Sequence, residues 1–192
     1  MIGLVMEGWR GMLGALRLLT FRPGGEAMFD VSLRGFWRSF GGILFALPLA
    51  ILAHVERQYI GTSVDATTYF LIFFGTWLSF PVSAAVAVAI AGARNRYMHW
   101  VVVHNWGVVW LYGVIAGILA LEVIGIINAE FRDFLFFLYG YLRILVHWRL
   151  AYVTLGLPTI TAALTATIPA MTSFLVLVAI SQALSGAQAA AG

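Results

Sequence analysis

Five stretches of the chain are apolar over about 20 residues or more, and this feature constrains the fold more than any other. They cover residues 36–54, 69–93, 100–127, 134–154 and 158–184. About 20 residues of α-helix cross the hydrocarbon core of a bilayer. Because lipid offers no hydrogen bonds to the backbone, each stretch is predicted to be a helix. The sequence therefore predicts an all-α, polytopic membrane protein, with a bundle of about five transmembrane helices over residues 36–184.

The composition agrees with lipid as the main solvent of the chain. Of the 192 residues, 62% are hydrophobic and 10% are charged, whereas soluble domains carry about 25% charged residues. The chain contains no cysteine, which excludes disulfides and thiolate metal sites. Its basic residues are scattered and form no patch, which argues against a nucleic-acid partner.

The two ends of the chain are predicted to lie outside the bundle. Residues 1–35 form a cytoplasmic interfacial segment, since Met1 to Phe21 separates into an apolar side with Trp9 and a polar side at helical period. Such a helix lies in the plane of the membrane surface; the alternative is a helix packed on the bundle. Residues 185–192 are predicted to be a short polar tail.

The distribution of arginines predicts the orientation. Arginines gather before the first span, after the second span and near the end of the fourth, and five crossings place these regions on one side. The positive-inside rule puts that side, and the N-terminus, in the cytoplasm and the C-terminus in the periplasm. All basic residues are arginine, which we interpret as the coding bias of a bacterium, so the expected location is a bacterial inner membrane.

Polar residues within the spans are the candidate functional residues. Arg143 lies near the middle of the fourth span, where a charge costs at least about 2.5–3.5 kcal/mol and must face protein or water. Tyr139, Arg143 and His147 are four residues apart and form one stripe. Glu122 lies on the third span, and a short loop joins the two spans, so we predict an intramembrane Arg143–Glu122 ion pair. The stripe would act as a structural lock, as a path for a proton or anion, or as a site facing a partner.

Histidines and glycines carry two further predictions. His104 and His147 fall at similar depth on neighbouring spans, which would permit bis-histidine ligation of haem b; the alternative is that each is a hydrogen-bonding or interface residue. No other cofactor and no metal site is predicted. Gly113, Gly117 and Gly125 share a stripe that predicts close helix packing. We expect this contact inside the chain, with a dimer contact as the alternative.

One segment resembles a known family. Residues 22–50, RPGGEAMFDVSLRGFWRSFGGILFALPLA, place a proline-containing break, a short amphipathic stretch and an aromatic-rich entry before the first span. With five spans and a cytoplasmic N-terminus, this layout resembles bacterial members of the Yip-type family, membrane proteins akin to the Rab-interacting proteins of eukaryotes. The resemblance implies a five-helix bundle and assigns no functional residue.

The functional expectation is non-enzymatic. The sequence has no hydrolase, zinc-protease or phosphate-loop motif and no paired intramembrane carboxylates. Its aromatic-rich spans and small extramembrane mass favour an accessory or scaffold subunit of a larger membrane complex, or a membrane-organising protein. Its partners would be the lipid bilayer and other membrane protein subunits. The alternatives are a small transporter or channel that uses Arg143, Glu122 and His147, and a b-type haem-binding electron-transfer subunit.

Overall fold

The computed structural model describes the backbone of residues 2–61 and 64–191, and the regular secondary structure of this part of the chain is all helical. Side chains are described for residues 3, 5–61 and 64–184. The α-helices are α1 (Ile2–Leu19), α2 (Leu33–Ser39), α3 (Gly42–Tyr59), α4 (Ala66–Ile90), α5 (Tyr97–Val123), α6 (Ala129–Leu155) and α7 (Thr159–Ala191). Two short 3₁₀ turns, η1 (Glu26–Met28) and η2 (Arg94–Arg96), lie before α2 and α5.

The fold confirms a polytopic α-helical membrane protein. Among the described residues, five helical segments are long and apolar enough to cross a membrane. They are Leu33–Tyr59, Ala66–Ile90, Arg94–Val123, Ala129–Leu155 and Thr159–Leu184. The predicted spans coincide with them apart from a few residues at their ends.

The first span is broken, where a single helix was predicted. α2 ends at Ser39 and α3 begins at Gly42, so the chain turns at Phe40 and Gly41. A Cβ atom at Gly42 would lie 2.6 Å from the backbone oxygen of Asn105. Only glycine permits this close approach of α3 to α5, and glycine is a weak helix former.

Small residues of α3 form a close interface against α5. Ala46, Ala50 and Ala53 have no exposed surface, and their spacing puts them on one side of α3. Ala46 and Ala50 pack with Val109, and Ala53 packs with Ala116. Small side chains allow such close helix contacts in lipid, where the hydrophobic effect cannot drive association.

The predicted glycine contact on α5 is largely wrong. A Cβ at Gly113 would meet Leu49 at 3.9 Å, an ordinary contact, whereas Gly117 faces open space. Gly125 lies in the turn after α5 with φ +75°. The reason is helical geometry: Gly117 follows Ala116, which faces α3, and one residue turns the helix by about 100°.

A buried hydrogen bond joins α5 to α2. The side-chain amide of Asn105 donates to the hydroxyl oxygen of Ser39 at 2.9 Å, and this hydroxyl donates to the backbone oxygen of Phe36 at 2.7 Å. Asn105 and Ser39 have no exposed surface. This contact ties the broken start of the first span to the middle of the bundle.

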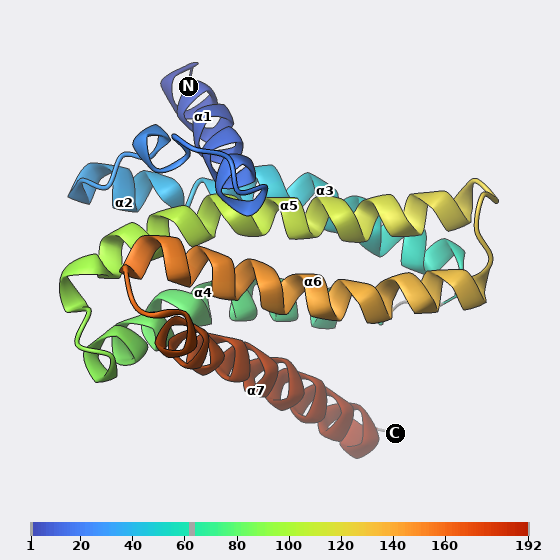
Figure 1. Ribbon diagram of the computed structural model, residues 1–192. Coiled ribbons are helices and arrows are strands. Elements are labelled where there is room, and N and C mark those ends of the chain that lie inside the picture. The colour runs from blue at the N-terminus through green and yellow to red at the C-terminus, as the bar shows by residue number, and fades with distance from the viewer. Residues whose placement is uncertain (1, 62–63, 192) are drawn as a thin grey trace.

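α1 crosses α5 at a steep angle (Figure 1) and packs through its small residues. A Cβ at Gly11 would lie 2.7 Å from the ring of Trp106. The Trp110 indole donates to the backbone oxygen of Met12, and Nε of Arg149 donates to that of Leu18, each at 3.0 Å. α1 therefore packs on the bundle.

The outward side of α1 remains available to the membrane surface. Val5 is 58% exposed and Trp9 is 59% exposed, and both belong to the predicted apolar side. Glu7, on the predicted polar side, forms an ion pair with Arg38 at 2.7 Å. The location of α1 in the membrane plane stays a prediction.

α7 packs along α4 and diverges from α6 (Figure 1). A Cβ at Gly75 of α4 would lie 2.9 Å from Ile180 of α7, which shows how closely these two helices approach. The turn between α6 and α7 contains Gly156, whose φ of +65° is left-handed. α7 continues to Ala191, so the predicted tail 185–192 is helical through residue 191, as its alanine-rich sequence allows; residue 192 lies outside the described residues.

Candidate functional site

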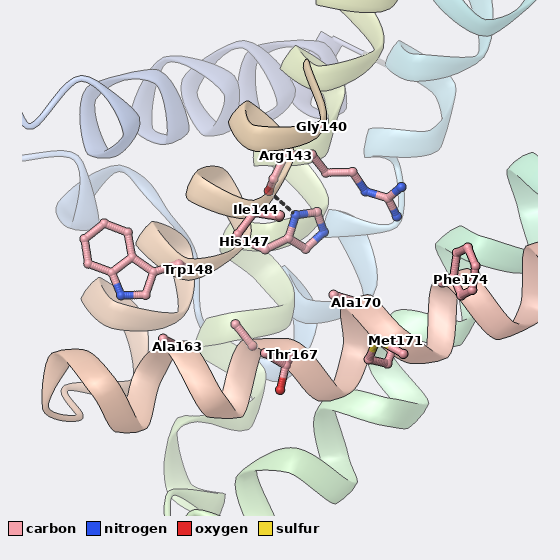
Figure 2. A pocket seen from close by; sticks show the side chains of 11 residues that line it. Gly140, Arg143, Ile144, His147, Trp148, Ala163, Thr167, Ala170, Met171 and Phe174 are labelled. Carbon is pink, nitrogen blue, oxygen red and sulfur yellow. Dashed lines mark hydrogen bonds between the residues drawn. The ribbon is translucent and has the colours of Figure 1, made fainter. Parts of the chain in front are cut away.

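A groove of about 490 Å³ lies between α6 and α7. Its lining extends from Trp148 and Ala163, on the side of the turn that joins the two helices, to Gly140 and Phe174 (Figure 2). α6 contributes Gly140, Arg143, Ile144, His147 and Trp148, and α7 contributes Ala163, Ala166, Thr167, Ala170, Met171 and Phe174. Within each set the spacings are one, three or four residues, so each set is one face of its helix.

A second cavity, the chamber, lies next to the groove and has a volume of about 210 Å³. Arg143, His147 and Phe174 line both the groove and the chamber. Residues of α4, α5, α6 and α7 surround the chamber, and its further polar members are Thr76, His104, Tyr112, Tyr139 and Ser173. Tyr139, Arg143 and His147, the predicted stripe, all line the chamber.

Arg143 has no counter-charge in the described part of the chain. It is half-buried near the middle of α6, a helix of 27 residues. The ion pairs among the described residues are Glu7–Arg38, Glu122–Arg132 and Arg132–Asp133. A guanidinium at this depth needs a negative or polar group to offset its desolvation.

The predicted Arg143–Glu122 pair is wrong. Glu122 accepts two hydrogen bonds from Nη1 of Arg132, both at 2.9 Å. Arg132 lies in the first turn of α6, at the same end of the bundle as Glu122 near the end of α5. Arg143 lies about 16 Å further along α6, at about 1.5 Å per residue. Depth therefore decides which arginine Glu122 can reach.

His104 and His147 come together, as their similar depth predicted. Their ring centroids are 5.2 Å apart. Nδ1–H of His147 donates to the backbone oxygen of Arg143 at 2.8 Å, the dashed contact in Figure 2. His104 stacks on Phe80 and is 5% exposed, yet neither of its ring nitrogens has a hydrogen-bond partner among the described residues.

This arrangement does not fit the predicted haem. A macrocycle between two ligating imidazoles would have to hold the rings apart, and here the two rings are in edge contact. The chamber, at about 210 Å³, is also smaller than the roughly 300–1,000 Å³ of ordinary ligand pockets. The pair of histidines instead forms a polar wall beside Arg143.

Part of the site lies on residues that sequence reasoning did not select. Thr76, Tyr112 and Ser173 come from three other helices, and only the tertiary packing brings them to Arg143. Gly140 gave a signal that was missed. It stands one turn from Arg143, and a Cβ at Gly140 would meet no atom within 4 Å, so this glycine leaves space instead of allowing contact.

The polar side chains around Arg143 are rich in hydrogen-bond donors. The guanidinium offers up to five N–H donors, and imidazoles and phenols add further ones. The lining of the groove and the chamber includes neither aspartate nor glutamate. The arrangement is therefore chemically suited to an anion.

Comparisons with known proteins identify no relative of this chain. No family model, curated protein or solved structure matches the chain. The fold and composition thus define the class, a polytopic α-helical membrane protein with an intramembrane arginine site. The resemblance to the Yip-type family stays a prediction.

Proposed function

We propose that this is a non-enzymatic protein that binds an anionic substrate at Arg143 inside the membrane, as a small transporter does. The observation that carries the proposal is the half-buried guanidinium near the middle of α6, which lines two adjoining cavities and has no carboxylate partner among the described residues. An anion would supply the missing charge. Glu122 takes no part, because Arg132 occupies it.

The neighbouring side chains support the same proposal. Arg143 would bind the charge through paired N–H donors, the geometry that guanidinium offers to carboxylates and phosphates. His104 and Tyr139 line the chamber beside it and would add hydrogen bonds to the remaining oxygens. The gap between α6 and α7 would provide the route of entry.

The distribution of arginines supports a bacterial inner membrane with the N-terminus in the cytoplasm. In that orientation the turn between α6 and α7 is cytoplasmic. The groove would then extend from near this turn to about the middle of the membrane, and the chamber would lie at about the middle. A test of this orientation is the position of a reporter fused to either end of the chain.

Native mass spectrometry of protein taken from its own membrane in mild detergent tests the proposed function. We expect a small anionic adduct on the wild type and on Arg94→Gln, which removes an exposed arginine outside the site, and its loss from Arg143→Gln. Arg143→Lys should retain part of this adduct, since lysine keeps the positive charge but lacks the paired N–H donors of the guanidinium. Absence of any Arg143-dependent adduct, together with Arg143-independent anion flux in liposomes, would contradict the proposal.

A second candidate is the accessory subunit of a larger membrane complex. The outer side of α6 favours it, because its large apolar residues are exposed, among them Phe131, Phe134, Phe137, Tyr141 and Leu145. A transmembrane helix of a partner would cover this side, which lies opposite Arg143 on α6. In the same mass spectra, a polypeptide released on activation from the wild type and from Arg143→Gln alike would favour this candidate.

A further inference from the structure

We infer that the ligand of Arg143 is a single-chain amphiphile with a carboxylate head, which enters sideways from the bilayer. Its head would occupy the chamber and its chain would lie in the groove. This inference rests on the proposed function and names its substrate class. Four features of the two cavities carry it.

The first feature is the contrast between the two cavities. The chamber gathers Arg143, His104, Tyr112 and Tyr139, whereas the groove is lined mainly by aliphatic and aromatic side chains. Arg143 and His147 belong to both, so the polar and apolar spaces meet at the charge. A water-soluble ion would need the chamber alone; a ligand with a polar head and an apolar chain uses both.

The second feature is an unsatisfied polar group in the chamber wall. His104 is 5% exposed, and both of its ring nitrogens lack a hydrogen-bond partner in the described part of the chain. Buried polar atoms are nearly always hydrogen-bonded in folded proteins. A carboxylate held by Arg143 would place an acceptor in the chamber that His104 also lines.

The third feature is the means by which the groove stays open. A Cβ at Gly140 would meet nothing within 4 Å, and Ala163 and Ala170 on the facing helix are also small. Trp148 and Phe174 stand toward the two ends of the groove (Figure 2). The volume of about 490 Å³ lies within the range for one small ligand and suits one chain better than two.

The fourth feature is the surface on which the groove opens. Ile144, Leu164 and Phe174 beside it are 66%, 64% and 56% exposed. These side chains lie within the two spans α6 and α7, so they face hydrocarbon when the protein is in a bilayer. A ligand would therefore reach the groove from the lipid and not from water.

Electron paramagnetic resonance of a spin-labelled stearic acid in proteoliposomes tests the inference. The probe is compared with its uncharged methyl ester at alkaline pH, where the acid is ionised, so that the two probes share one chain and differ in the charge of the head. We expect the wild type to immobilise the acid with a several-fold preference over the ester. Arg143→Gln should reduce this preference to about onefold, because the charge is lost and the groove is kept.

Filling the groove gives the second arm of the test. Gly140→Phe should abolish immobilisation of both probes, and Gly117→Phe, at an exposed helical glycine that also has open space, should leave both unchanged. Ala170→Phe with Ala179→Phe as its exposed control repeats the comparison on α7 if Gly140→Phe does not fold. Equal immobilisation of acid and ester, or no effect of either groove variant, would overturn the inference.

The outcomes separate this inference from the proposed function. If anion flux or adduct formation depends on Arg143 while the wild type shows no preference for stearic acid, the substrate is a water-soluble anion and only the inference fails. If a phosphate-bearing single-chain probe is preferred and stearic acid is not, the carboxylate head is wrong. If no anion depends on Arg143, both proposals fail.

Discussion

The interfaces α3–α5 and α6–α7 are built from similar residues and have opposite characters. Both are rich in glycine and alanine, yet Gly42, Ala46 and Ala50 are packed without space, while Gly140 and Ala170 border a groove. The apolar windows of the spans that contain α3 and α5 are 39% buried, against 22% for those of α6 and α7. Small residues thus permit a close contact without enforcing one.

The difference follows from the direction of the neighbouring helices. α3 packs alongside α5, so its alanines contact that helix along several turns. α7 instead packs alongside α4, and it diverges from α6 beyond the turn that joins α6 to α7 (Figure 1). The small residues on the facing sides of α6 and α7 therefore remain without a partner, and the charge of Arg143 lies in the space that results.

The largest expected effect comes from a substitution in the closely packed α3–α5 interface. Gly42→Leu would drive a side chain into the backbone of α5, since even a Cβ at Gly42 would lie 2.6 Å from the oxygen of Asn105. We expect a loss of at least about 3 kcal/mol in the free energy of unfolding, the upper range for overpacking. Thermal unfolding in detergent, followed by size-exclusion chromatography, measures it. Gly117→Leu is the control, and equal stability of the two variants would refute the close approach.

The next effect concerns the ion pair of Glu122 and Arg132, which joins the end of α5 to the first turn of α6. Their side chains are each 12% exposed, so Glu122→Gln or Arg132→Gln should cost on the order of 2 kcal/mol. A double-mutant cycle of these two should show a coupling energy of about 0.5–3 kcal/mol. The cycle of Glu122→Gln with Arg143→Gln should be additive. Coupling between Glu122 and Arg143, with none between Glu122 and Arg132, would show that Glu122 pairs with Arg143 instead.

A smaller effect compares two glycine positions directly. Gly140→Ala should stabilise the protein by up to about 1 kcal/mol, because alanine favours the helix and its methyl group meets open space. Gly11→Ala should destabilise it, because its Cβ would lie 2.7 Å from the Trp106 ring. Melting temperatures of the two variants should therefore move in opposite directions. A fall for Gly140→Ala would mean that α6 has a close neighbour at this position.

The smallest effect is a control at a helix end outside both interfaces. Asp65 caps α4, and its carboxylate accepts hydrogen bonds from Thr68, which lower the pKa of Asp65. Stability from a lowered pKa is complete above the ordinary value near 4 and falls as pH drops through the lowered pKa. Wild type should therefore exceed Asp65→Asn slightly in melting temperature at neutral pH, and the gap should narrow as the pH falls below the ordinary pKa of the carboxyl group. A gap that widens in acid would contradict the cap.

Local features of the site could be predicted from the sequence. The five spans follow from long apolar stretches, and the stripe Tyr139, Arg143 and His147 follows from helical periodicity. The approach of His104 to His147 was predictable from their depth on antiparallel neighbours. The partner of Glu122 was missed because the charged residues at 130–133 resemble a loop, whereas α6 already begins at Ala129, with Asn128 as its N-cap. The predicted start of the fourth span, residue 134, is therefore five residues later than the start of α6.

The groove itself could not be predicted from local sequence. It exists because α7 packs along α4, which depends on contacts such as Gly75 with Ile180 that are far apart in the chain. The same limit applies to α1, where Gly8 meets Phe45 and Gly11 meets Trp106. In each case the residue types were visible, and the neighbour that each residue meets was not.

Photo-cross-linking in membranes tests the central claim, a lipid-accessible groove with an anion site at Arg143. A stearic acid analogue with a diazirine on its chain is irradiated with the protein, and the modified peptides are mapped. We expect adducts to concentrate on Ile144, Trp148 and Met171 of the groove, and to fall in Arg143→Gln. Adducts spread in proportion to exposure, with Val82 and Ile90 (71% and 73% exposed) labelled as strongly as the groove, would contradict the account.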